Sequence, residues 1–288
     1  MDKTERKVAV VTGASRGAGR GIATALGRKG YRVYVTGRSE REGDATLPGT
    51  IYSTAKDVTD AGGEGIAVRV DHADDDAVRV LFEQVKSESG RIDMLVNNVA
   101  AVRDDLTDPG NFWEKSLGLV EILNVGLRSQ YVASYYAAPM MVAQGSGLIA
   151  FTSSFGASCY MHGPAYGAQK AGLDKMAADM AVDLRDSGVA AVSIWMGPLL
   201  TERAMRTFAQ FPDEAYRNFA EQAETPEFPG LILAALAEWP DLSTVSGQTL
   251  IGAEIADRLG IKDVNGKQPP SYRDMLGEPR VPHPAIIR

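Results

Sequence analysis

The feature that most constrains this fold is a run of glycines directly after a buried strand. Residues 7–12 (Lys-Val-Ala-Val-Val-Thr) predict the strand, and a helical pattern through Arg28 follows the glycines. Glycine lets the backbone approach a pyrophosphate closely, and a helix N-terminus offers unpaired N–H groups and a positive dipole end. The turn therefore predicts a dinucleotide site, formed by Gly13, Ser15, Arg16, Gly17 and Gly19.

The alternation of strand and helix continues along the chain. An apolar run that starts at Leu148 predicts one more strand, and similar runs predict others at residues 31–36, 65–70, 92–96, 189–195 and 244–251. This alternation favours a single α/β domain with the Rossmann architecture, in which a doubly wound, seven-stranded parallel sheet carries helices on both faces. We expect that domain to span residues 1–260.

Two segments near the end of the chain have other expected roles. Residues 202–228 are helical in pattern and lie beyond a strand end, where a substrate lid would be. Their aromatic side chains could equally pack against the protein: Phe208, Phe211, Tyr216 and Phe219. The prolines in residues 261–288 predict an extended arm that is not a packed element.

The end of the second strand predicts which dinucleotide binds. An acidic residue there would select NAD by bonding both ribose hydroxyls, but Gly37 and Arg38 stand in its place. Arg38, with Arg16 from the glycine turn, could hold a 2′-phosphate. The alternative is that both arginines are solvated surface residues. Because the missing acid and the two cations agree, we predict NADP(H).

A serine, a tyrosine and a lysine follow the strand at Leu148. Tyr166 and Lys170 are four residues apart in a predicted helix, so they share one face. A nearby ammonium would lower the pKa of the phenol and make it a usable proton donor, while Ser153 would hold a reacting carbonyl. We therefore predict catalytic roles for Ser153, Tyr166 and Lys170.

The same spacing occurs a second time, at Ser39, Tyr52 and Lys56. This copy lies beyond the second strand, on the adenosine side of a doubly wound sheet, whereas the nicotinamide binds across the switch point. We therefore interpret Tyr52 and Lys56 as a solvated helix face.

Other polar residues allow more than one interpretation. The acidic run from Asp71 to Asp76 resembles a metal cluster, but a helix cap with an acidic first turn is favoured, and no metal site is predicted. Asp71 could also contact the adenine. Asn124, inside a predicted helix over residues 117–142, either opens a water-filled kink or is a satisfied core residue. Cys159 is interpreted as a small buried filler, with redox chemistry as the alternative.

Composition excludes several functions. The net charge of −7 argues against a nucleic-acid or anionic-membrane partner. The opening residues lack the apolar core of a secretory signal, and no stretch approaches the length of a membrane span. A single cysteine suits a reducing compartment. We therefore expect a cytoplasmic protein without a membrane span.

Taken together, the Thr-Gly-x-x-x-Gly-x-Gly turn and the Ser153, Tyr166 and Lys170 set resemble the short-chain dehydrogenase/reductase family over roughly residues 7–252. The resemblance implies that Asn124 holds a water in a proton relay to Lys170. It also implies that Asp71 binds the adenine, that Asn97 lies at a cofactor-side strand end and that Thr201 binds the nicotinamide carboxamide.

Two positions depart from the family pattern. Ala100 and Met196 replace a usual glycine and proline beside the expected cofactor cleft. The related enoyl-reductase pattern is absent, because its tyrosine position is Gly163. The resemblance further implies a homodimer or homotetramer assembled through helices at residues 117–142 and 164–185.

Four segments resemble one mammalian dehydrogenase/reductase subgroup, which is associated with NADPH-dependent reduction of steroid and xenobiotic carbonyls. They are residues 112–114, 124–128, 174–178 and 259–266. We therefore expect an NADP(H)-dependent oxidoreductase that interconverts a small-molecule carbonyl and an alcohol by hydride transfer, with Tyr166 as acid and base. The alternatives are a cofactor-binding sensor or scaffold without turnover and a redox-neutral epimerase.

Overall fold

The computed structural model describes residues 6–210 and 214–288. The aromatic lid residues singled out from the sequence fall outside what is described, either as whole residues or as side chains, so that expectation stays a prediction: Phe208, Phe211, Tyr216 and Phe219. No helix within the described ranges is long and apolar enough to cross a membrane.

A seven-stranded sheet forms the centre of the molecule, and every pairing in it is parallel. The strand order is β3-β2-β1-β4-β5-β6-β7, so the chain reverses direction across the sheet between β1 and β4. This order confirms the predicted doubly wound fold. The strands are β1 (Val8–Val11), β2 (Arg32–Gly37), β3 (Glu64–Arg69), β4 (Met94–Asn97), β5 (Gly147–Ser153), β6 (Val189–Trp195) and β7 (Thr249–Ile251).

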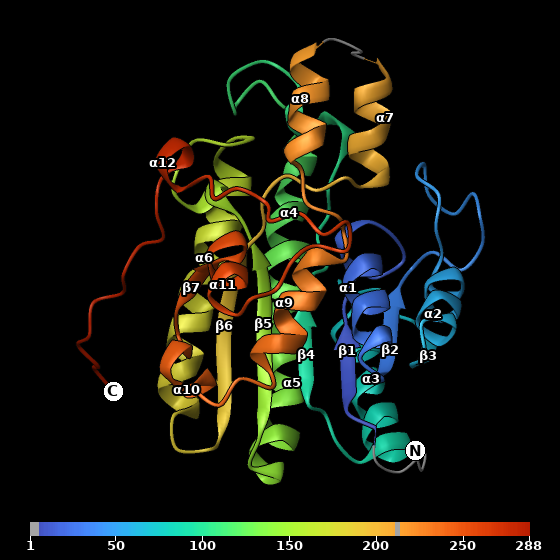
Figure 1. Cartoon of the computed structure of the whole chain (residues 1–288), viewed down its shortest axis with the longest axis vertical. Helices are drawn as coiled ribbons and strands as arrows, with labels where there is room; N and C mark the ends of the chain where they lie inside the picture. Colours follow the sequence, from blue (N-terminus) through green and yellow to red (C-terminus); the bar gives the residue numbers. More distant parts are fainter. Residues whose placement is uncertain (1–5, 211–213) are drawn as a thin grey trace.

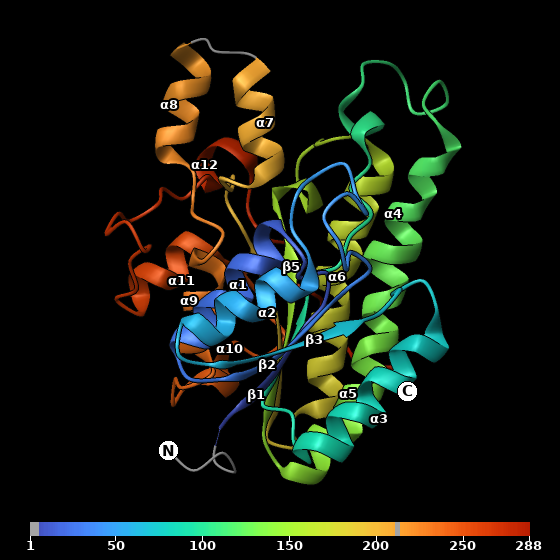
Figure 2. The ribbon, with the colours of Figure 1, turned by 90° about the vertical axis from the view of Figure 1, so that its right-hand side faces the viewer.

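Helices cover both faces of the sheet (Figures 1 and 2). One layer contains α1 (Gly17–Arg28), α2 (Ile51–Asp60), α9 (Phe228–Leu236), α10 (Leu242–Val245) and α11 (Gly252–Arg258). The opposite layer contains α3 (Asp75–Ser89), α5 (Ser129–Gln144) and α6 (Pro164–Leu184). The remaining helices lie toward the carboxyl ends of the strands: α4 (Glu121–Leu123), α7 (Glu202–Gln210), α8 (Glu214–Gln222) and α12 (Arg273–Leu276).

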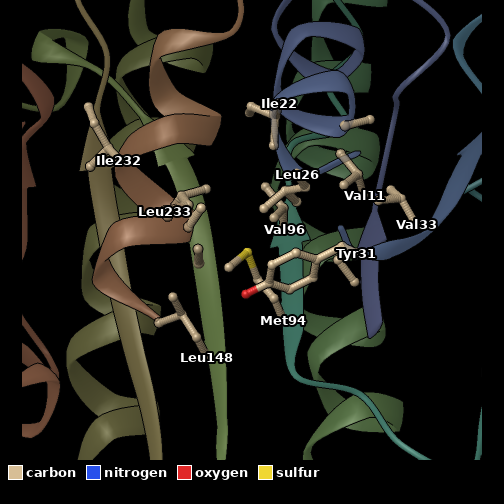
Figure 3. Packing of buried hydrophobic residues seen from close by; sticks show 14 of the residues in the cluster. Val11, Ile22, Leu26, Tyr31, Val33, Met94, Val96, Leu148, Ile232 and Leu233 are labelled. Carbon is tan, nitrogen blue, oxygen red and sulfur yellow. The ribbon is translucent and has the colours of Figure 1, made fainter. Parts of the chain in front are cut away.

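Strand alternation gives each layer its own core. In β1, Val8 and Val10 pack into the layer of α3, α5 and α6, while Ala9 and Val11 pack into the layer of α1 and α9. Figure 3 shows the second of these cores, where Val11, Ile22, Leu26 and Val96 lie close together. Every residue of the central strands β1, β4 and β6 is buried, so these strands are nearly continuous apolar runs, whereas the edge strand β3 is only partly covered.

Three predicted elements differ from those observed. The strand expected at residues 244–251 shrinks to Thr249–Ile251, because residues 242–245 form α10. The helix expected over 117–142 is interrupted by a π turn at Asn124–Arg128. The helical pattern over 202–228 divides into α7 and α8, and α9 begins only at Phe228.

The C-terminal arm is also different from its prediction. Asp263 is only 3% exposed, and Tyr272 and Leu276 pack against Phe155 and Trp195. The expectation of an arm that does not pack is therefore wrong for residues 263–276. The prolines set an extended backbone, but apolar side chains between them still find a partner beside the end of β6.

Candidate functional site

A cavity of about 1210 Å³ lies at the carboxyl ends of the parallel strands. Its lining includes the glycine turn after β1, the ends of β2 and β4, and Tyr166 and Lys170 on α6. Ligands of doubly wound sheets bind at this position, where neighbouring connections leave on opposite faces of the sheet. The fold therefore brings the two ends of the predicted site into one cavity.

The glycine turn has the geometry that a closely approaching ligand needs. Gly13 and Gly17 adopt left-handed backbone angles, with φ of +65° and +57°. A Cβ atom on Gly19 would lie 2.4 Å from the carbonyl oxygen of Gly13, so only glycine is tolerated there. The turn is also fixed to β4, because Asn98 Nδ2 donates to the Thr12 and Gly13 carbonyl oxygens at 2.9 and 3.1 Å.

The two predicted phosphate-binding arginines have different surroundings. The Arg16 guanidinium donates to the Pro48 and Gly49 carbonyl oxygens and to Ser39 Oγ, and burial lowers its pKa. The Arg38 side chain is 70% exposed and lies 3.8 Å from the Asp71 carboxylate. Arg16, Arg38, Asp71 and Ser15 all line the cavity. Arg38 is therefore the more available cation, while Arg16 is largely committed to the loop before α2.

The hydroxyl that meets Tyr166 belongs to Ser154. The Ser154 and Tyr166 side-chain oxygens are 2.9 Å apart, whereas Ser153 is fully buried and donates to the Lys170 carbonyl oxygen at 3.2 Å. Ser153 is the last residue of β5 and points to the same face as Phe151, into the layer of α5 and α6. Ser154 therefore occupies the position beside the phenol that we expected for Ser153, and the catalytic role of Ser153 stays a prediction.

Lys170 lies on the same face of α6 as Tyr166, as predicted. Its Nζ atom is 5.4 Å from the centre of the Tyr166 ring and donates to the Thr152 carbonyl oxygen at 3.1 Å. Burial lowers the pKa of Lys170 to about 8. Burial also raises the pKa of the Tyr166 phenol, and the Ser154 hydroxyl only partly opposes this rise. Burial has the largest effect in the protein without its cofactor, and the expected lowering, to which a cationic cofactor ring would contribute, stays a prediction for the bound state.

Asn97 and Asn124 do not line the cavity. Asn97 is fully buried, and its Nδ2 donates to Ser134 on α5 at 2.9 Å. Asn97 is the last residue of β4, as expected, but its neighbour Asn98 is the one that lines the cavity, and a contact between Asn97 and a cofactor stays a prediction. Asn124 is exposed and donates to Glu121 at 3.2 Å, which contradicts the core alternative. It begins the π turn, but nothing joins its side chain to Lys170, and its relay role stays a prediction.

The far wall of the cavity comes from the segment after β6. Met196 and Thr201 line it, as Ala100 does from the end of β4, so both departures from the family pattern lie at the site. Glu224, which is 2% exposed, accepts a hydrogen bond from the Gly197 N–H at 3.0 Å. Burial raises the pKa of Glu224 to about 8. This carboxyl thus fixes the backbone from which Thr201 extends.

The structure also shows where the second tyrosine and lysine pair, the acidic run and the single cysteine lie. Tyr52 is 55% exposed on α2, and Lys56 pairs with Asp60, so both lie on a solvated helix face. Asp74 caps α3 by accepting from the backbone N–H groups of residues 76 and 77, which confirms the predicted cap. Cys159 is partly buried beside Phe155 and Trp195.

Sequence reasoning missed four residues at this site: Ser154, Asn98, Glu202 and Glu224. Ser154 and Asn98 each follow a residue that was chosen, and the alternation of side chains along a strand was the signal that could separate them. Glu202 and Glu224 reach the site only through long-range folding. No local pattern marks either of them.

Comparison with known proteins places the chain in a family. Residues 7–211 match the family model for short chain dehydrogenases. The chain is 40% identical over 276 residues to human dehydrogenase/reductase SDR family member 1, covering 92% of this chain and 86% of that protein. This member belongs to the subgroup that the four sequence segments indicated, which confirms that resemblance.

Two solved structures have the same fold. A short chain dehydrogenase from Mycobacterium thermoresistibile is similar with a TM-score of 0.75 and 25% identity, covering 90% of this chain and 89% of the other. A metagenomic short-chain oxidoreductase in complex with NADP gives a TM-score of 0.67 and 28% identity, covering 85% and 96%. Enzymes of this family bind nicotinamide cofactors. The chain belongs to the short-chain dehydrogenase/reductase family of oxidoreductases.

Proposed function

We propose that the protein is an NADP(H)-dependent oxidoreductase that interconverts a small-molecule ketone or aldehyde and the corresponding alcohol. The observation that carries this proposal is that Tyr166 and Lys170 line one cavity with the glycine turn, while the Ser154 hydroxyl lies 2.9 Å from the Tyr166 phenol. A proton donor, a cation and a second hydroxyl lie at one end, and a site suited to a diphosphate lies at the other.

The cavity suits a dinucleotide in its backbone as well as its side chains. Gly13, Gly17 and Gly19 leave a surface without side chains at the N-terminus of α1. At the end of β2, Gly37 precedes the exposed Arg38, and the chain carries no acidic side chain there that would pair with a ribose 2′-hydroxyl. These residues support NADP(H). When bound, that cofactor supplies or accepts the hydride.

The remaining steps belong to the residues of this chain. The phenol of Tyr166 is protonated near neutral pH and can give its proton to a carbonyl oxygen in the reductive direction when its phenolate is stabilised, because burial alone raises its pKa. The Ser154 hydroxyl, 2.9 Å from the phenol, can donate to the same oxygen and orient it. The ammonium of Lys170 stabilises the phenolate that remains, because it lies near the ring in a buried environment.

We also propose a homo-oligomer, with a dimer or tetramer formed through α5 and α6. Tyr131 and Tyr135 on α5 are 54% and 64% exposed, and they are one turn apart on the helix. Aromatic side chains on one exposed stripe are typical of an interface between subunits. Light scattering coupled to size-exclusion chromatography tests this, and a monomer at micromolar concentration would contradict it.

The experiment that tests the function titrates the protein with NADPH and with NADH while nicotinamide fluorescence is followed. We expect NADPH to bind more tightly, and Arg38→Asp to weaken NADPH binding by about tenfold or more, since it removes a charge-assisted contact. Arg16→Ala serves as the comparison and should have the smaller effect. A screen of ketones with NADPH follows. Binding without turnover of any carbonyl would favour the sensor alternative, and conversion without a change in cofactor absorbance would favour an epimerase.

A further inference from the structure

A carboxylate from α7 already occupies the N-terminus of α1. Glu202 is the first residue of α7, and its Oε2 atom accepts a hydrogen bond from the Gly17 N–H at 2.9 Å. Gly17 is the first residue of α1, and the capping residue Arg16 makes no side-chain cap bond. The start of α1 thus receives its anion from a residue 185 positions further along the chain.

This contact is at the place where the proposed cofactor needs its diphosphate. The N–H groups at the start of α1 and the positive end of its dipole attract one anion. Glu202 is 27% exposed, so its charge is partly shielded from water. Arg20 lies 4.0 Å from Glu202 but pairs more closely with Asp57, at 2.7 Å. The diphosphate of the cofactor and the Glu202 carboxylate are both anions, and both would bind at the same N–H group of Gly17.

The rest of α7 holds Glu202 over the turn. Arg203 and Arg206 both pair with Asp104, which lies in the segment after β4. Thr201 Oγ1 accepts a hydrogen bond from the Ala204 N–H at 3.2 Å and caps the helix start. Anchors on both sides keep the carboxylate at a high effective concentration beside Gly17.

We propose that the Glu202 carboxylate competes with the diphosphate of the cofactor for the N-terminus of α1 and so sets the affinity of the protein for its cofactor. The inference rests on the proposed function, because it assumes that a dinucleotide binds in this cavity. Glu202 touches the cofactor site and not the reacting atoms, so it tunes binding and release and takes no part in proton transfer.

The test compares Glu202→Gln with Glu227→Gln. Glutamine at 202 can still accept from the Gly17 N–H, so the start of α1 stays satisfied and only the charge is lost. Glu227 is the matched control: its side chain is 25% exposed and lies 3.5 Å from Arg28, at the other end of α1. Dissociation constants are measured by fluorescence or calorimetry for NADPH and for adenosine 2′-monophosphate, which lacks the diphosphate.

Competition predicts that Glu202→Gln tightens NADPH binding by about two- to fivefold, the size of one charge at a helix N-terminus. Binding of adenosine 2′-monophosphate should not change, and Glu227→Gln should leave both constants near those of the wild type. Unchanged or weaker NADPH binding by Glu202→Gln would overturn the inference, as would an equal gain for the monophosphate. If the wild-type protein binds no NADPH, the proposed function fails first, and the two failures are thereby distinguished.

Discussion

The two ends of the cavity are built in different ways. At the cofactor end, the glycine turn acts through its backbone, and the residues that matter lie within a few positions of one another after β1. At the reaction end, the important groups are side chains from the residue after β5, from α6 and from the segment between α8 and α9. A backbone site is encoded locally, whereas a side-chain site depends on how distant elements pack. The reaction end should therefore be the more sensitive to single substitutions.

The largest expected effect is at Tyr166. Tyr166→Phe removes the proton donor but keeps the ring that packs beside His162 and Lys170. We expect turnover of a carbonyl substrate with NADPH to fall by about 10²- to 10⁴-fold, since general acid catalysis is lost. NADPH binding, measured by fluorescence, should remain near the wild-type value, because the glycine turn is untouched. Substantial residual turnover would contradict the role of Tyr166 and remove the contrast between the two ends.

A smaller effect separates the two neighbouring serines. Ser154→Ala removes the hydroxyl beside the phenol, and we expect turnover to fall by about 10²-fold, as for the loss of one donor to a reacting oxygen. Ser153→Ala should leave turnover within a few-fold of the wild type and lower the free energy of unfolding by about 1 kcal/mol, since a buried hydrogen bond is lost. Steady-state kinetics and urea denaturation measure both effects. The reverse pattern would restore the assignment made from sequence spacing.

The smallest expected effect is a pH dependence of stability that comes from Glu224, beside the segment after β6. The folded protein raises the pKa of Glu224 from 4.5 to about 8, so the native state holds a proton that the unfolded chain releases between these values. The contribution of Glu224 to the free energy of unfolding should therefore be complete below pH 4.5 and should be lost as the pH rises toward 8. Asp263, which packs nearby, adds to the rise in the pKa of Glu224.

Thermal unfolding between pH 5 and pH 8.5 tests this dependence. Glu224→Gln keeps an oxygen acceptor for the Gly197 N–H and removes the titration, so its Tm should change less with pH than that of the wild type. Glu238→Gln, at a surface position with a side chain 58% exposed, is the control and should keep the wild-type slope. Parallel curves for all three proteins would show that Glu224 does not titrate in this range.

At two strand ends, sequence reasoning chose the residue just before the one that meets the cavity or the phenol. Ser153 and Asn97 are the last residues of β5 and β4, and both point into the layer of α5 and α6. Asn98 follows Asn97 and lines the cavity, and Ser154 follows Ser153 and contacts the Tyr166 phenol. Spacing along the chain locates the strand end, but the register of the sheet decides which of two adjacent side chains faces the ligand.

The sequence by itself determined the architecture and the cofactor end of this protein. Buried strands alternating with helices, and glycines that tolerate left-handed angles, follow from local sterics and hydrophobic patterning. Only the tertiary structure decided that Ser154 meets Tyr166, that Glu202 meets Gly17 and that Glu224 is buried under Gly197. These contacts join residues up to 185 positions apart, and burial changes the pKa of Lys170 and Glu224 only after the layers have packed around them.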